Sequence, residues 1–394
     1  MRWPEIQLRY LSKEPISNGL GESGDSRNPL DWPRYIRTTD IKSLLTLHED
    51  RRVTLPPAMA KASSVRKGDI LMTAAGATVG KSFQYCECEP ACYAGYLVRW
   101  RVAAEIASPR FMAYWTESKH FYDQIAAGMV KSTIENFSAS KYRSMRAPVP
   151  PLDEQRAIAD YLDRETQKID ELITEQRGLI ETLKERRRSL IDLGAEKASA
   201  EQIRLRYLFT PSEVRDCHDE RVLSVYRDFG VIPKGSREGN HNVTPEDVSR
   251  YLLVRPGDLV VNRMKAWQGS LGVSQYRGIV SGDYEVLRPA TDRLLPEFAH
   301  LYLRSARMVG RYVVRSTGIR PSQWRLYWKQ MADIEIPVPG VQEQQKIVSF
   351  VSEQTSRIDE LIAESEDLIS LSQERRAALI TTAVTGQIDV GEAS

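Results

Sequence analysis

Residues 147–173 read APVPPLDEQRAIADYLDRETQKIDELI, and residues 336–362 read IPVPGVQEQQKIVSFVSEQTSRIDELI. The two stretches align without a gap at the offset that takes Pro148 to Pro337, here called the repeat offset, and 20 of the 44 positions in 148–191 are identical in 337–380. Each copy closes a globular segment of similar length. An internal repeat of this extent defines the architecture before any local motif does. The chain is therefore predicted to consist of two copies of one unit.

Apolar residues recur three or four positions apart in both copies, which predicts a long helix with a heptad seam in each. The first seam is Ile158, Leu162, Ile169, Leu172, Leu179, Leu183 and Leu190, and the second keeps Ile347, Val351, Ile358, Leu361, Leu368 and Leu379. Ile173, Ile180, Ile362 and Ile369 widen the apolar seam on one side. About 38 residues at 1.5 Å each make a rod of roughly 57 Å, too long to fold back on its own globule. The simplest cover for each apolar stripe is the other copy, so we expect an antiparallel coiled coil with the globules at opposite ends.

The globular segments share strand signals. KGDILMTAAG and GYLVRWRV in the first copy have counterparts PGDLVVNR and DYEVLR in the second, and all four read as short β-strands. The Gly-Asp pairs at 68–69 and 257–258 are again related by the repeat offset. The globules are therefore expected to be homologous, like the rods.

Each globule also predicts one helix behind its strands. The first runs from a capping Ser108, with Pro109 at the first helical position, to Gly128. The second starts at Pro296 and ends at Gly318. These patterns predict an α+β fold in which two homologous globular domains are joined by two long helices with a pseudo-twofold internal repeat. The expected boundaries are 1–147 and 203–336 for the globules and 148–202 and 337–394 for the helical spacers.

The bulk composition, with 394 residues, 41% hydrophobic and 27% charged, fits two or three domains. No apolar run could span a bilayer, and the N-terminal residues lack the apolar stretch of a signal peptide. Four cysteines make no disulfide framework. We expect a cytoplasmic protein with no membrane partner.

Charge divides along the repeat. Residues 1–147 and residues 203–336 each hold 21 Lys and Arg against 15 Asp and Glu, whereas the spacers are acidic. Two basic globules on acidic connectors indicate two modules that bind a polyanion.

The basic, polar loops that follow Gly128 and Gly318 are the segments expected on DNA, because cations pair with phosphates and forked side chains read base edges. The candidates there are Lys131, Ser132, Thr133, Arg320, Ser322, Gln323 and Arg325. A second candidate set, at aligned places nearer the strands, is Lys81, Lys265, Trp267 and Gln268. The alternative, that each is an ordinary surface residue of a basic protein, stays open.

Charged residues shared by both rods are candidates for binding a partner protein, although such charges also serve simply as a solvated face. They are Glu154, Asp170, Glu171, Glu175, Arg186 and Arg187 in the first copy, with Glu343, Asp359, Glu360, Glu364, Arg375 and Arg376 in the second.

Two other patterns only resemble catalytic or metal sites. GATVGKS at 76–82 has three residues between its glycines where a P-loop has four, and no helix is expected after it. Cys86, Cys88 and Cys92 lack the spacing of a zinc site, and the second copy has no counterpart. The sequence gives no positive sign of a catalytic centre or a metal site.

The chain resembles the specificity subunit of type I restriction-modification systems over nearly its whole length. The resemblance rests on the twice-used pattern PxPxxxEQxxIxxxL…T…IDELI…LI…ER…LI, with GDILMTAAGATVGK in the first globule and NRMKAWQGSLGV and GIVSGDYEVLRP in the second. It implies two target recognition domains, each reading one half of a split, asymmetric sequence in double-stranded DNA. It also implies that the rods act as a ruler between the half-sites.

The same resemblance implies a non-catalytic chain without its own cofactor. Two modification subunits would dock on the rods and carry S-adenosylmethionine for adenine methylation. Restriction subunits, which translocate and cleave DNA, would use ATP and Mg. Two alternatives remain: an enzyme with a degenerate nucleotide or methyl-donor site, and a stand-alone DNA-binding or coiled-coil adaptor. No methyltransferase glycine loop or (N/D)PP(Y/F) tetrad is present, and the matching basic globules argue against a pure adaptor.

Overall fold

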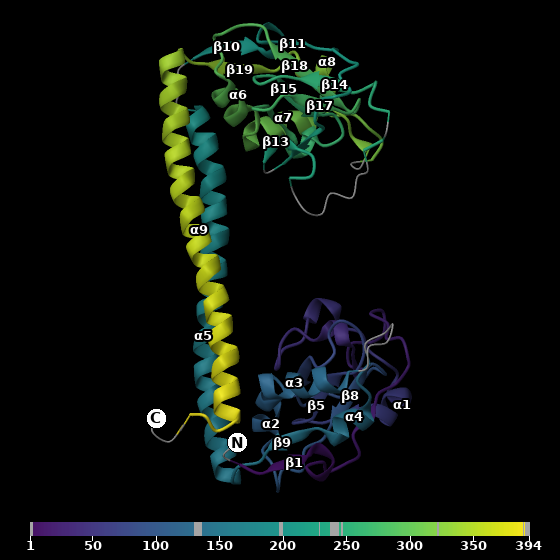
Figure 1. Ribbon diagram of the computed structural model, residues 1–394. Coiled ribbons are helices and arrows are strands. Elements are labelled where there is room, and N and C mark those ends of the chain that lie inside the picture. Colours follow the sequence, from purple (N-terminus) through teal and green to yellow (C-terminus); the bar gives the residue numbers. More distant parts are fainter. Residues whose placement is uncertain are drawn as a thin grey trace. The chain divides into compact units, whose positions relative to one another are not determined.

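A computed structural model (Figure 1) describes residues 3–129, 136–196, 200–227, 229–236, 244–245, 247–320, 323–388 and 390. The chain forms two compact units, Met1–Gln176 with Glu366–Ser394, and Arg177–Ser365. Each unit thus combines one globule with part of both long helices. No helix in the described part of the chain is both long and apolar enough to cross a membrane.

The two predicted rods are helices α5 (Leu152–Glu196) and α9 (Val341–Val384), which Figure 1 draws in teal and in yellow-green to yellow. In the first unit, Ile158 and Leu162 of α5 share a core with Ile380 and Ala383 of α9, so the start of one helix lies against the end of the other. The antiparallel coiled coil and the α+β class predicted from the sequence are confirmed.

On α5 the seam passes through the isoleucines that were predicted only to widen it on one side, and not through two of the predicted leucines. Ile173 and Ile180 are buried, whereas Leu172 and Leu179 are exposed, as are Leu361 and Leu368 in the second copy. The seam on α5 alternates steps of three and four residues through Thr166, Ile169, Ile173, the half-buried Gln176, Ile180 and Leu183. Leu172 and Ile173 stand three and four residues after Ile169, so both fit the heptad spacing and the sequence alone does not choose between them.

The first globule is built on a four-stranded sheet with the order β2-β8-β5-β6. Its strands are β2 (Ser17–Asn18), β8 (Leu97–Trp100), β5 (Ile70–Thr73) and β6 (Ser82–Gln84), beside a second sheet of β3 (Arg34–Ile36), β7 (Ala91–Tyr93) and β4 (Ser64–Val65). Strand β1 (Glu5–Gln7) pairs with β9 (Arg146–Pro148), which leads into α5. The helices are α1 (Pro57–Ala60), α2 (Pro109–Trp115), α3 (Lys119–Gly128) and α4 (Ala139–Ser144).

The second globule repeats this plan with the order β11-β18-β15-β16. The strands are β11 (Phe209–Pro211), β18 (Tyr284–Pro289), β15 (Leu259–Asn262) and β16 (Leu271–Val273), with the pairs β12 (Leu223–Tyr226)-β13 (Gly230–Pro233) and β14 (Leu252–Val254)-β17 (Gly278–Val280). Strand β10 (Glu201–Arg204) pairs with β19 (Glu335–Val338), which leads to α9. The helices are α6 (Pro296–Leu303), α7 (Ala306–Arg315) and α8 (Trp328–Met331).

Strand register shows that the globules are homologous. Ile70 lies opposite Gln84 in the first sheet, and Leu259 lies opposite Val273 in the second. Both members of this pair are shifted by the same repeat offset that relates the rods. The predicted strands in both copies are thus confirmed.

Each predicted globule helix is in fact two helices. Ser118 and Ser305 begin α3 and α7, because each side-chain oxygen accepts a hydrogen bond from the backbone N–H three residues on. The cap predicted at Ser108 is present. The predicted end at Gly318 is wrong: α7 ends at Arg315, and Gly318 belongs to the following loop.

A buried glutamine fastens each globule to its rod. Gln155 Oε1 accepts the N–H of Ser108 at 2.7 Å, and its Nε2 donates to the carbonyl of Pro150 at 2.8 Å. Gln344 accepts the N–H of Leu295 at 2.8 Å and donates to the carbonyl of Pro339 at 2.7 Å. Both glutamines have no exposed surface. The repeated Glu-Gln motif therefore has a structural role at its second position.

Candidate nucleic-acid interface

In the second globule the two predicted DNA-binding segments come together. Trp267 lies in a 3-10 turn, η6 (Ala266–Gln268), and its ring meets that of Trp324 edge to face with centroids 5.4 Å apart. The Trp267 Nε1–H donates to the carbonyl of Met264 at 3.0 Å, which fixes the ring. Lys265 and Gln268, on the same segment as Trp267, are exposed. The sequence presented these segments as separate candidates, whereas the fold makes them neighbours.

The loop after α7 is closed at its foot by backbone pairing. Thr317 and Arg325 exchange hydrogen bonds of 3.0 and 2.9 Å, and the N–H of Gln323 donates to the carbonyl of Arg320 at 2.8 Å. Gly318 is needed here, because a Cβ atom would stand 2.7 Å from the Gln323 carbonyl oxygen. Ile319 is 95% exposed.

The predicted side chains of this loop are accessible. Arg320, Gln323 and Arg325 are all exposed. The loop therefore presents two guanidinium groups, one amide and one aliphatic side chain to solvent. Ser322, the fourth predicted residue of this loop, lies outside the described residues.

The two candidate DNA-binding loops are anchored by equivalent backbone hydrogen bonds. The N–H of Leu326 donates to the carbonyl of Arg263 at 2.9 Å, and in the first globule the N–H of Phe137 donates to the carbonyl of Ala74 at 2.7 Å. The two donors are related by the repeat offset, and so are the two acceptors. The same backbone hydrogen bond therefore follows the loop in both globules, although the loop sequences differ.

The foot of the first loop is closed by Lys141. Its ammonium donates to the carbonyl of Gly128 at 2.8 Å and lies 5.6 Å from the centre of the Phe137 ring. The predicted residues Lys131, Ser132 and Thr133 lie outside the described residues. Their assignment to DNA stays a prediction.

Lys81 has an intramolecular partner. Its ammonium donates to the carbonyl of Ile41 at 2.7 Å, and the side chain is half-buried. The segment before it turns at Gly76 and Gly80, with φ angles of 85° and 88°, and continues into strand β6. As predicted, no helix follows this P-loop-like segment. A DNA contact by Lys81 stays a prediction and would compete with this hydrogen bond.

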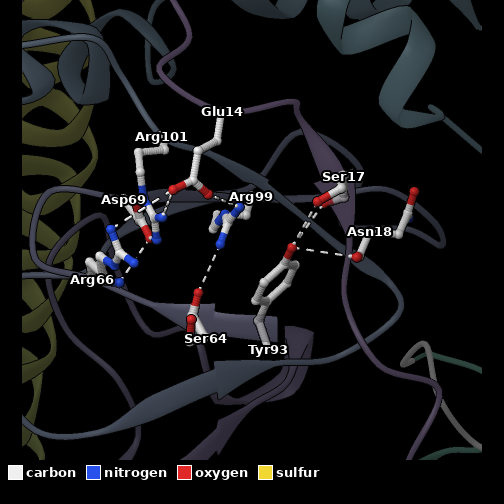
Figure 2. Close-up of polar contacts among 9 residues, drawn as sticks. All are labelled: Glu14, Ser17, Asn18, Ser64, Arg66, Asp69, Tyr93, Arg99 and Arg101. Atoms are coloured by element: carbon white, nitrogen blue, oxygen red, sulfur yellow. Dashed lines mark hydrogen bonds and ion pairs between the residues drawn. The ribbon is translucent and has the colours of Figure 1, made fainter. Parts of the chain in front are cut away.

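Part of the basic excess of the first globule is used internally (Figure 2). Arg101 grips the buried Asp69 through two hydrogen bonds of 2.7 and 2.6 Å and also contacts Glu14. Arg99 reaches Glu14 at 2.8 Å and the carbonyl of Ser64 at 2.9 Å. These arginines stabilise the sheet and are not available to a polyanion.

The aspartate of the repeated Gly-Asp pair makes similar contacts in both globules, and Figure 2 shows those of Asp69 in the first. Asp69 accepts the N–H of Arg66 at 2.8 Å, and Asp258 accepts the N–H of Arg255 at the same distance. Arg288 Nε lies 3.5 Å from Asp258, as Arg101 lies beside Asp69. Each aspartate closes a turn and contacts an arginine, Arg101 directly after strand β8 and Arg288 within strand β18. Burial raises the pKa of Asp258.

A groove of about 730 Å³ lies in the first unit between the loop at 43–46 and both long helices. Asp163 at its edge accepts hydrogen bonds from Arg110 Nε at 2.8 Å and from the Tyr114 hydroxyl at 2.6 Å. Burial raises the pKa of Tyr114 to about 12, so the phenol stays protonated and donates. Among the predicted partner-binding residues, the groove is lined by Asp170, Glu171, Glu175 and Arg376.

Four predicted partner-binding residues contact one another within the chain. Arg376 Nε lies 3.1 Å from Asp170 Oδ1, and Arg187 Nε lies 3.2 Å from Asp359 Oδ1. The others leave at least part of their side chains accessible along the helices: Glu154, Glu171, Glu175, Arg186, Glu343, Glu360, Glu364 and Arg375. Their role in binding a partner stays a prediction.

In the part of the chain that the structure covers, no group of three or more His, Cys, Asp or Glu residues could hold a metal ion. Cys92 is buried in strand β7, whereas Cys86 and Cys88 are exposed.

No family model matches the chain. A sequence comparison finds similarity to the type I restriction enzyme EcoKI specificity subunit of Escherichia coli strain K12, with 21% identity over 310 residues. The match covers 71% of this chain and 65% of the relative, just under two thirds of the relative's own length.

Solved structures share the fold across nearly the whole chain. A chain from work on complex assembly and conformational transition of the type I R-M system superposes with a TM-score of 0.72, at 14% identity and with 97% of both chains covered. The HsdS subunit from Thermoanaerobacter tengcongensis superposes with a TM-score of 0.56, at 15% identity and with 98% of this chain and 97% of that one covered. The resemblance predicted from the repeated rods is thereby confirmed.

Proposed function

We propose that this chain, which has the fold of the HsdS subunits and sequence similarity to a type I specificity subunit, is the DNA sequence-specificity subunit of a type I restriction-modification complex. Its two globules would each read one half of a bipartite, asymmetric sequence. The observation that carries this proposal is the shared loop frame with unlike loops, marked by the equivalent hydrogen bonds of Phe137 and Leu326. A split site with unlike halves requires two globules that share a fold but recognise different DNA sequences.

The second globule supplies chemistry suited to DNA. Arg325 and Arg320 are exposed cations with forked donors, which can pair with phosphates or bind guanine bidentately. Gln268 and Gln323 offer both a donor and an acceptor to a base edge. The Trp267–Trp324 contact holds these two segments against each other, and ordering before binding reduces the entropic cost of recognition.

The rods are proposed as the docking surface for two like partner subunits. Leu172 and Leu179 are exposed seven residues apart, on one face of α5, and Leu361 and Leu368 repeat the pair on α9. Exposed leucines duplicated with the repeat fit two copies of one partner. Charged residues that occur in both rods, such as Glu175 and Glu364, would lie around the edge of these contacts.

The partners in this proposal are two methyltransferase subunits and the translocating nuclease subunits, working on DNA in the cytoplasm of a prokaryotic cell. The chain itself would be non-catalytic: S-adenosylmethionine, ATP and Mg would be bound by the partners. The alternative is a stand-alone DNA-binding or coiled-coil adaptor protein. It would bind DNA or another helix equally well without a methyltransferase.

The test is to co-express the chain with a candidate type I methyltransferase subunit from the same genome and to map the methylated adenines across a genome. We expect one split motif with unlike halves. Replacing residues 203–336 by the corresponding globule of a relative should change one half only. Methylation of a continuous palindrome would contradict the proposal, and so would a change in both halves after the exchange.

A further inference from the structure

One four-residue sequence occurs in both globules at equivalent places. Leu-Arg-Tyr-Leu stands at residues 8–11 and again at 205–208. Because this separation differs from the repeat offset of the rods, an ungapped comparison does not align the two occurrences. The fold does.

Each occurrence forms a 3-10 turn directly after the strand that pairs with the entrance to a rod. These turns are η1 (Leu8–Tyr10) and η5 (Leu205–Tyr207). The N–H of Leu8 donates to the carbonyl of Met145, and that of Leu205 donates to the carbonyl of Ile334, both at 2.9 Å. The two acceptors are related by the repeat offset, so the turns occupy the same site in the repeat.

Core packing explains why the leucines of this sequence recur, but not why the arginine and the tyrosine recur. Leu8 and Leu205 are fully buried, and so are the leucines that close each turn. Tyr10, however, is 63% exposed and Tyr207 is 65% exposed. Arg9 and Arg206, between the buried and the exposed residues, are exposed as well. A core needs the leucines, but it does not need an arginine and a tyrosine facing solvent at the same place twice.

The surroundings of the two pairs indicate a protein partner. Arg206 contacts Asp333, and neighbouring Arg204 lies 3.2 Å from Glu335. These two carboxylates disfavour a DNA phosphate at the second turn. At the first turn the Arg9 guanidinium lies 4.8 Å from the centre of the Tyr10 ring. What the turns share is an exposed tyrosine directly after an exposed arginine in the sequence. Tyrosine and arginine are enriched among the residues that dominate binding at protein interfaces.

We propose that Tyr10 and Tyr207 are equivalent anchor residues for two copies of one protein partner. Each copy would take one tyrosine ring into an apolar pocket with a polar group for its hydroxyl. This inference rests on the proposed function, because it takes the two methyltransferase subunits as those copies. It places their contact at the foot of each rod, on residues outside the helices.

The experiment uses the full chain and its methyltransferase subunit, with the mass of the complex measured by light scattering over a dilution series. The wild-type chain should hold two copies. Tyr10→Ala and Tyr207→Ala should each weaken one of the two by about 30-fold, the effect of a hot-spot loss of about 2 kcal/mol. The double variant should weaken both.

Tyr96→Ala is the matched control, because Tyr96 is 69% exposed and belongs to no repeated turn. It should leave the stoichiometry unchanged. Circular dichroism and the melting temperature should match the wild type for all variants, since the truncated rings are exposed.

Two copies retained with unchanged affinity by the double variant would overturn this inference while leaving the proposed function intact. Unchanged partner binding with weaker, less salt-dependent DNA binding would also overturn it, and would assign the turns to DNA phosphates. A wild-type chain that binds no methyltransferase subunit would overturn both proposals.

Discussion

Arg376 Nε lies 3.1 Å from Asp170 Oδ1, and the repeat makes the same ion pair a second time, between Arg187 and Asp359 at 3.2 Å. In the first pair α9 supplies the arginine and α5 the aspartate. In the second pair α5 supplies the arginine and α9 the aspartate. The pairing shows that the pseudo-twofold symmetry of the sequence extends to individual side-chain contacts. The two pairs differ in burial, because Arg376 is 21% exposed and Arg187 is 45% exposed.

This difference predicts unequal effects of removing the arginines. Arg376 also contacts Glu117 of the first globule at 2.9 Å, so Arg376→Ala breaks two ion pairs at a partly buried site. We expect a loss of about 2 kcal/mol in the free energy of unfolding, against less than about 1 kcal/mol for Arg187→Ala at its more exposed site. Urea unfolding measures both. Equal losses would show that the contact with the globule does not contribute.

Replacing either buried glutamine should loosen a globule from its rod. Gln155→Leu leaves the N–H of Ser108 and the carbonyl of Pro150 without their buried partner. We expect a cost of about 2 to 4 kcal/mol, since each orphaned polar group costs about 1–3 kcal/mol. Gln344→Leu should behave alike, and Gln345→Leu, on the exposed face next to it, should be neutral. Differential scanning calorimetry provides the measurement, and a neutral Gln155→Leu would refute the role assigned here.

The tryptophan contact predicts a local effect on specificity. Trp324→Ala removes an edge-to-face contact of about 1 kcal/mol and frees the segment that carries Arg325. Methylation should lose fidelity in one half-site and keep it in the other. Arg325→Lys, which keeps the charge but loses the forked donors, should give the same pattern with unchanged salt dependence. Loss of fidelity in both half-sites would contradict the assignment.

Acid should destabilise the second globule through His300. Its burial, together with nearby Arg304, lowers the pKa to about 4, from an ordinary value of 6.5. In the unfolded chain the His300 imidazole therefore binds a proton below about pH 6.5, whereas in the folded chain it binds one only below about pH 4. Stability from the neutral imidazole is complete above pH 6.5 and is lost as the pH falls toward 4, by up to about 3 kcal/mol. His300→Gln should flatten this part of the pH profile of urea unfolding, whereas parallel profiles would rule out His300 as its source.

The rods predict the spacing of the half-sites. Inserting seven residues, one heptad, at matching places in α5 and α9 keeps the seam and lengthens each helix by about 10 Å. Mapped methylation should then show the same two half-sites with a longer spacer. An unchanged spacer would refute the ruler.

The architecture of two globules and two long helices could be predicted because the sequence contains two copies of the same unit. The heptads of both rods, the Gly-Asp turns at 68–69 and 257–258, and the helix starts at Ser108 and Pro296 are local signals, and the repeat doubles each of them. Where two local signals compete, the prediction was wrong. The apolar period continues across Ser118, so the helix break was missed. Leu172 was placed in the centre of the seam and Ile173 at its side, whereas Ile173 is the buried one.

The arrangement of the candidate site could not be predicted, because it depends on contacts between distant residues. Trp267 and Trp324 lie far apart in the chain, and neither sequence segment signals the other. The hydrogen bond of Lys81 to the carbonyl of Ile41 likewise depends on how two loops pack. For Tyr10 and Tyr207 a signal does exist, the repeated Leu-Arg-Tyr-Leu, but only the fold shows that the two occurrences are equivalent.

Gln155 and Gln344 bind only backbone groups of the globules they hold. A side chain that binds only backbone groups does not depend on which side chains the globule carries. This attachment is therefore compatible with any globule that presents the start of a helix at the same place. Under the proposed function, exchange of one globule at this attachment would change one DNA half-site in a single step and leave both long helices unchanged.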